Sequence, residues 1–121
     1  AASDGYKRQA QDVLRSAVDG EGEMRQQLAL YKDYQKRMDD SHTLPVDVEV
    51  QLLMRFTRIG ELKDAEQLAQ KLNEEKASDP LLEKAMTQLG QAFAQYNATK
   101  AAHFAALAEN IRLRQQRTAA D

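Results

Sequence analysis

Apolar residues recur at helical spacing through residues 45–80, where the pattern of the chain is clearest. One stripe is formed by residues at steps of 4, 4 and 3, namely Val48, Leu52, Phe56 and Ile59. A second stripe begins beyond Gly60 and comprises Leu62, Ala65, Leu68, Ala69 and Leu72. Such steps place side chains on one face of an α-helix, and a glycine after a stripe supplies the left-handed conformation that ends a helix. The segment therefore predicts two antiparallel helices that pack against each other.

The short run 46–50 alternates apolar and polar residues, which is the pattern of a half-buried strand. It follows Pro45 and continues without a break into the helical spacing of the first stripe. We therefore interpret it as the beginning of a helix rather than as a strand. Apolar residues beside the main stripe, among them Val50 and Met54, indicate a helix that is contacted on more than one side.

Four further helices are predicted by similar stripes before and after this segment. Their expected ranges are 4–18, about 23–40, 81–96 and about 100–117. Asp79 and Pro80 suit the start of the helix that follows them. Asn97 is expected to adopt the left-handed conformation, and Thr99 is expected to cap the last helix.

The predicted fold class is all-α, with six helices in three antiparallel hairpins at about 4–40, 45–77 and 79–117. A single domain covers residues 1–121, because this length supports one core and not two. The inner positions of the stripes give the expected core: Leu14, Leu28, Tyr31, Leu52, Phe56, Leu62, Ala65, Leu68, Leu72, Leu89, Phe93, Ala102, Phe104 and Ile111.

Composition narrows the classes of protein to consider. The chain is 42% hydrophobic and 30% charged, as in soluble folded domains. With 17 basic and 19 acidic residues its net charge is −2, so the chain has no overall positive field that would attract nucleic acid or an anionic membrane surface. No transmembrane span is expected, and the absence of cysteine removes disulfides and thiolate metal sites. The sequence does not decide the cellular compartment, and both the cytoplasm and the bacterial periplasm are compatible with it. The chain starts without methionine, which fits a processed end or, preferably, a segment of a longer protein.

The three turns give the register of an internal repeat. Gly22, Gly60 and Asn97 are 38 and 37 positions apart. A leucine stands eight residues before each turn residue. The positions four residues before and five residues after each turn residue can be matched in the same way. The matched sets are Leu14, Leu52 and Leu89; Val18, Phe56 and Phe93; and Gln27, Ala65 and Ala102. Three units in phase resemble the tetratricopeptide repeat (TPR) family, whose first helix carries a leucine, a small residue and an aromatic residue.

The TPR resemblance covers about residues 8–114 and implies a right-handed α-solenoid whose first helices line a concave groove. Such a module binds proteins, as an adaptor, assembly factor or chaperone scaffold. The sequence departs from the family in its longer spacing, its lack of an early tryptophan and the polar Gln27. A plain six-helix bundle is the alternative fold. The 35-residue spacing of Pro45 and Pro80 also resembles an RNA-binding pentatricopeptide repeat, but the neighbouring units do not keep that period.

Catalytic chemistry finds little support in the sequence. His103 lies in an alanine-rich helix and resembles a phosphotransfer histidine, although Ala106 and Leu107 stand where that family has lysine and glycine. A phosphotransfer signalling domain is therefore the second functional hypothesis. His42 is about 60 residues away, so a histidine metal site is not expected. We predict a protein that is not an enzyme and that uses no cofactor.

The repeat register predicts where a protein or peptide partner would bind. The positions beside the packed leucines, off the buried stripe, are Asp12, Ser16, Val50, Met54, Thr57, Arg58, Thr87, Gln91 and Gln95. Val50 and Met54 are apolar where a solvated groove would be polar, which is typical of a binding surface. The opposing interpretation is that both pack against a neighbouring helix. Arg58 and Gln91 would orient the ligand by hydrogen bonds, and a second copy of the chain is a further candidate partner.

Overall fold

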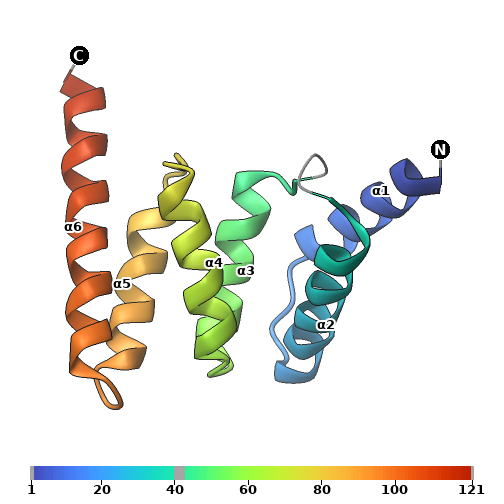
Figure 1. Cartoon of the computed structure of the whole chain (residues 1–121), viewed down its shortest axis with the longest axis horizontal. Helices are drawn as coiled ribbons and strands as arrows, with labels where there is room; N and C mark the ends of the chain where they lie inside the picture. The colour runs from blue at the N-terminus through green and yellow to red at the C-terminus, as the bar shows by residue number, and fades with distance from the viewer. Residues whose placement is uncertain (1, 40–42, 121) are drawn as a thin grey trace.

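The computed structural model describes residues 2–39 and 43–120, and this part of the chain consists of α-helices and short connections without strands (Figure 1). The helices are α1 (Ala2–Arg15), α2 (Glu21–Arg37), α3 (Val46–Arg58), α4 (Leu62–Glu74), α5 (Leu82–Phe93) and α6 (Ala98–Ala120). The prediction of an all-α chain with six helices is confirmed, including the helical start of α3. None of the described helices has the length and apolar character needed to cross a membrane.

Helix α3 is the centre of the array. Consecutive helices pack in the pairs α1–α2, α3–α4 and α5–α6, and α3 also contacts α1, α2 and α5. Figure 1 shows the helices following one another across the molecule, from the N-terminus on one side to the C-terminus on the other. The first helices of the three pairs therefore contact each other in order, α1 with α3 and α3 with α5.

Two helix ends depend on a left-handed residue. Gly60 has φ +79°, and the Glu61 backbone N–H donates to the Phe56 carbonyl at 3.0 Å, which closes α3 as predicted. Lys76 has φ 52° at the end of α4, a position that the sequence did not reveal. Asn97 is not left-handed. Its side-chain oxygen instead accepts the Lys100 backbone N–H at 3.0 Å, so Asn97 and not Thr99 caps α6.

These two left-handed residues predict opposite effects of exchanging glycine and a side chain. Gly60→Ala is expected to lower the free energy of unfolding by about 1 kcal/mol, because a Cβ is unfavourable at this φ. Lys76→Gly is expected to raise it by up to about 1 kcal/mol for the same reason. Urea denaturation of both variants measures the difference. Equal signs for the two substitutions would contradict the assigned conformations.

Most of the predicted core is buried, but two of its residues are not. Leu62 is only partly buried, and Ala102 is exposed. Among the residues of α6 whose burial is described, Phe104, Ala108 and Ile111 are buried. Ala102 precedes Phe104 by two positions and therefore projects from a different side of the helix. Tyr96, the last residue of the range expected for the fifth helix, is 77% exposed because α5 ends at Phe93.

The α5–α6 pair packs closely through a glycine. A Cβ added at Gly90 would lie 3.3 Å from the carbonyl oxygen of Ala101 and 3.4 Å from the backbone nitrogen of Ala105. Phe93 and Phe104 stack beside this contact, with ring centroids 5.8 Å apart. Gly90, next to the fully buried Leu89, therefore marks a place where the two backbones approach each other.

Candidate functional site

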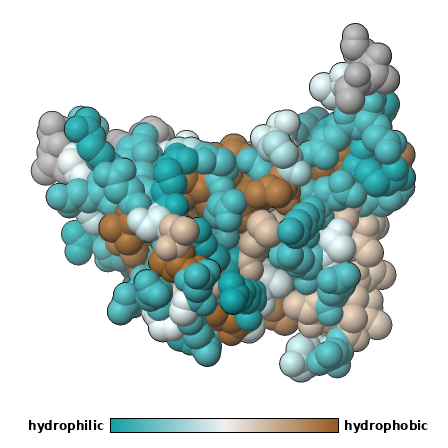
Figure 2. Space-filling view, turned by 180° about the vertical axis from the view of Figure 1, so that it is seen from behind, coloured by the Kyte–Doolittle hydropathy of each residue, from teal (hydrophilic) through white to brown (hydrophobic). Residues whose placement is uncertain are grey.

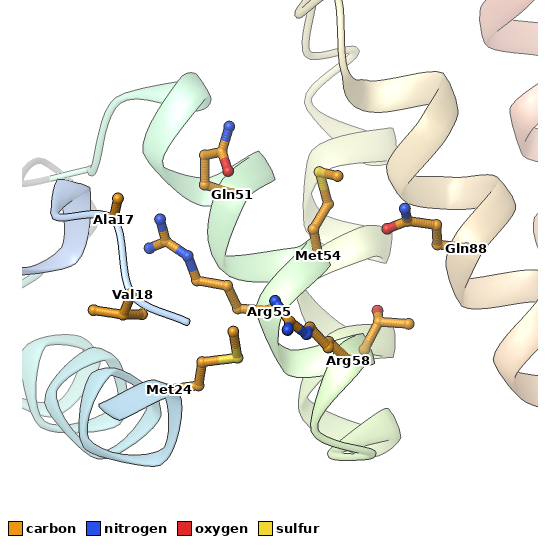
Figure 3. Close-up of a pocket in the computed structure, with 9 residues that line it drawn as sticks. Ala17, Val18, Met24, Gln51, Met54, Arg55, Arg58 and Gln88 are labelled. Carbon is orange, nitrogen blue, oxygen red and sulfur yellow. The ribbon is translucent and has the colours of Figure 1, made fainter. Parts of the chain in front are cut away.

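A cavity of about 450 Å³ lies where the α1–α2 connection, α3 and α5 meet. It is lined by Ala17, Val18, Met24, Gln51, Met54, Arg55, Thr57, Arg58 and Gln88. Figure 3 shows Arg55 projecting from α3 toward Val18 and Met24. Met54 lies on the other side of α3, toward Gln88 of α5. The cavity therefore has methionine side chains on both sides of an arginine.

A second cavity of about 600 Å³ adjoins the first and is lined by residues from the end of α3, the start of α4 and the region of α5. Thr57 and Arg58 line both cavities. The remaining lining residues of the second are Gly60, Glu61, Leu62, Lys63, Gln91, Ala92, Gln95 and Tyr96. We call the two cavities together the α3 groove. On the face of the molecule seen in Figure 2, apolar patches lie among hydrophilic side chains.

The α3 groove brings together part of the predicted partner-binding set. Met54, Thr57 and Arg58 line its first cavity, and Gln91 and Gln95 line its second. The other predicted positions lie elsewhere. Thr87 lines a separate hollow of about 380 Å³ between α5 and α6, which Gln91 also borders. Asp12 and Ser16 are exposed but line neither cavity of the groove.

The prediction that Val50 faces a partner is wrong. Its exposed fraction is 0%, and it belongs to the hydrophobic core, whereas Met54 one turn later is partly buried at the groove. Helix α3 is packed by helices of the preceding and the following pair, so its flank is covered at the level of Val50. Met54 does line the groove, but the register could not show that the helix surface is enclosed one turn earlier.

Two polar side chains of neighbouring helices satisfy the carbonyl groups at the end of α1. The Gln27 amide of α2 donates to the Val13 and Ser16 carbonyl oxygens at 3.0 and 3.2 Å. The Arg55 guanidinium of α3 donates to the Leu14 carbonyl at 2.9 Å and to the Gln27 side-chain oxygen at 3.0 Å. Gln27 is buried, and these hydrogen bonds satisfy its amide, so a polar side chain is tolerated where the matched positions hold Ala65 and Ala102.

The electrostatics of the groove are dominated by cations. Arg55 has only uncharged oxygen partners, and burial lowers its pKa below the ordinary arginine value. Arg58 is exposed and makes no hydrogen bond or ion pair with the described residues. Glu61, the acidic residue of the lining, is paired with Arg25 at 2.6 Å. The groove thus presents arginine charge that no carboxylate of the described chain balances.

Comparisons with protein-family models, curated proteins and solved structures find no match. The geometry of the described residues therefore carries the functional argument.

A buried ion pair on α3 was not predicted. Glu49 is 2% exposed, and its carboxylate accepts a hydrogen bond from the Lys71 ammonium of α4 at 2.6 Å. Both residues border a cavity of about 150 Å³ beside Tyr31 and Tyr34. Burial raises the pKa of Glu49, and the hydrogen bond from Lys71 only partly offsets this effect. Burial alone would lower the pKa of Lys71, but its pairing with Glu49 keeps that pKa above the ordinary value.

His103 forms no metal-ligand group with other described residues. His103 is exposed on α6 and contacts the ring of Phe104 edge-on, with centroids 4.9 Å apart. His42 lies outside the described residues. Within the ranges 2–39 and 43–120, no three His, Asp or Glu side chains are grouped as metal ligands would be. We therefore take the α3 groove as the candidate functional site.

Proposed function

We propose that the chain is a protein-interaction module, arranged as a TPR-like solenoid, that binds a segment of another protein in the α3 groove. The observation that carries the proposal is that two neighbouring cavities share Thr57 and Arg58 in their linings. The groove crosses from the α1–α2 connection over α3 to the end of α5. An elongated groove of this kind suits an extended or helical polypeptide better than a compact small molecule.

The lining chemistry also supports a polypeptide ligand. Gln51 and Gln88 line the first cavity, and Gln91 and Gln95 line the second. Glutamine amides donate and accept hydrogen bonds, as the exposed backbone of a bound segment requires. Between these amides, Met54 offers an apolar surface that adapts to differently shaped partners. An adaptor or assembly function needs this combination of apolar contact and adjustable polar contact.

A photo-crosslinking experiment tests the proposed site. A benzoylphenylalanine side chain placed at Gln91, which is exposed in the groove, is expected to capture a partner in extracts of the producing cells. The same group at Gln70, exposed on α4, serves as the matched control. The captured product is expected at Gln91 and not at Gln70, and Met54→Ser is expected to reduce it, because the anchor surface is lost. Gel shift and mass spectrometry of the product measure both effects.

Two results would contradict the proposed function. One is identical crosslinked products at Gln91 and Gln70, which would indicate contact without a site. The other is unchanged capture at Gln91 in the Met54→Ser variant with an unchanged melting temperature, which would place the partner outside the groove. The melting temperature is measured in parallel, since Met54 is partly buried and its truncation also removes some packing.

A further inference from the structure

We infer that the segment bound in the α3 groove carries a carboxylate next to a bulky apolar side chain, with Arg55 and Arg58 receiving the acid and Met54 and Val18 receiving the apolar group. The inference rests on the proposed function and specifies the chemistry of its partner.

The arginines of the groove differ from most other arginines of the described chain. Within the described residues, four arginines outside the groove pair with carboxylates: Arg15 with Asp47, Arg25 with Glu21 and Glu61, Arg37 with Asp33, and Arg112 with Glu109. Arg55 and Arg58 have no carboxylate partner, and both line the same cavity. They stand three positions apart on α3, so their side chains leave the same side of the helix. Two such guanidinium groups suit one carboxylate or two neighbouring ones.

The charge of the groove is local and does not reflect the whole protein. The chain has a net charge of −2, yet the groove contains Arg55, Arg58 and Lys63 against a single acidic side chain. That side chain, Glu61, is already bound by Arg25. A positive hollow on a slightly acidic protein favours an acidic ligand through charge complementarity, and it disfavours a basic one.

The apolar part of the lining distinguishes a polypeptide from a simple anion. Met54 of α3 and Val18 of the α1–α2 connection are partly buried apolar side chains of the cavity, whereas Met24 of α2, at 2% exposure, contributes only to its wall. A free anion such as phosphate would contact the arginines and leave these surfaces without a partner. A carboxylate followed by an aliphatic or aromatic side chain would use both. A cavity of about 450 Å³ accommodates such a side chain together with its backbone.

Peptide selection tests the inference. The purified chain is panned against a phage-displayed library of random dodecapeptides, and enriched sequences are expected to place Asp or Glu beside Leu, Met or Phe. A synthetic enriched peptide is then titrated by calorimetry against the wild type and against Arg58→Glu. Reversal of the charge is expected to weaken binding at least about tenfold, the scale of a charge-assisted hydrogen bond. Replacement of the acidic residue of the peptide by its amide is expected to weaken binding to a similar degree.

Arg117→Glu is the matched control, because Arg117 is exposed near the end of α6 and its reversal makes the same change in net charge. It is expected to bind like the wild type, and both variants are expected to melt like the wild type. Enriched peptides without acidic residues, or equal affinity for the acid and the amide peptide, would overturn the inference and leave the proposed function intact. If no enriched peptide loses affinity for the Met54→Ser variant, both the inference and the proposed function would be overturned. Binding of inorganic phosphate alone, without peptide enrichment, would also overturn both.

Discussion

Replacement of Phe56 by alanine is expected to lower the free energy of unfolding by about 3–5 kcal/mol, the largest effect of any substitution considered for this chain. Phe56 is completely buried in α3, and its ring lies 5.8 Å from the ring of Tyr31 in α2. Because α3 contacts α1, α2, α4 and α5, a cavity at this position loosens the centre of the array. Urea denaturation followed by circular dichroism measures the loss.

Tyr96→Ala is the control for the loss of an aromatic ring. Tyr96 is 77% exposed, so its truncation is expected to change the free energy of unfolding by no more than about 0.5 kcal/mol. A comparable cost for the two substitutions would show that Phe56 is not the central packing residue. In the predicted TPR-like register Phe56 and Phe93 occupy equivalent positions, so a small cost of Phe56→Ala would also count against that register.

The second large effect concerns the buried ion pair. Lys71→Met is expected to lower the free energy of unfolding at neutral pH by roughly 2–3 kcal/mol, because the Glu49 carboxylate is left buried without its cation. The value is set below that for a fully enclosed pair, since the Lys71 side chain is 35% exposed and a small cavity adjoins both residues. Chemical denaturation at pH 7 measures it.

The pH dependence of this variant follows from the raised pKa of Glu49. Because burial raises that pKa, the folded protein retains the proton to higher pH than the unfolded chain does. The contribution of Glu49 to stability is therefore full below the ordinary glutamate pKa and declines as pH rises through the raised value. Without Lys71 the pKa rises further, so the cost of Lys71→Met is expected to shrink on acidification and to grow toward neutral pH.

The double variant Glu49→Gln with Lys71→Met separates charge from packing. Since it carries no buried carboxylate, it is expected to recover a substantial part of the stability that Lys71→Met loses at pH 7 and to lack the added pH dependence. A cost of Lys71→Met that stays constant between pH 4 and pH 8 would instead assign the effect to lost packing of the lysine stem, and the electrostatic explanation would be wrong.

The elements that the sequence predicted well are those set by local periodicity. Leu52, Phe56 and Leu89 lie on regular stripes and are fully buried, and Gly60 ends α3 in the expected conformation. Met54 and Arg58, which the repeat register selected, both line the first cavity, but their role in binding stays a prediction. These features depend on neighbours within one or two helical turns, which a single sequence records directly.

The features that the sequence did not reveal depend on residues far apart along the chain. Val50 and Met54 are one turn apart and both apolar, and only the packing of other helices buries the first and leaves the second at the groove. Glu49 and Lys71 are 22 positions apart, and no periodic pattern indicates that they pair. Gln27 did not fit the register because its side chain hydrogen-bonds carbonyl groups at the end of another helix, α1.

The hydrogen bonds of Arg55 connect helix termination to ligand recognition. Its guanidinium is fixed by the Leu14 carbonyl and by Gln27, and the same group lines the groove. A ligand carboxylate that binds the remaining N–H groups meets a cation whose rotamer is already ordered, so less conformational entropy is lost on association. Each bond to that carboxylate in turn holds the guanidinium against the last turn of α1. If the proposed ligand binds in this way, occupancy of the groove and docking of the first helix are thermodynamically coupled, and each favours the other by the same free energy.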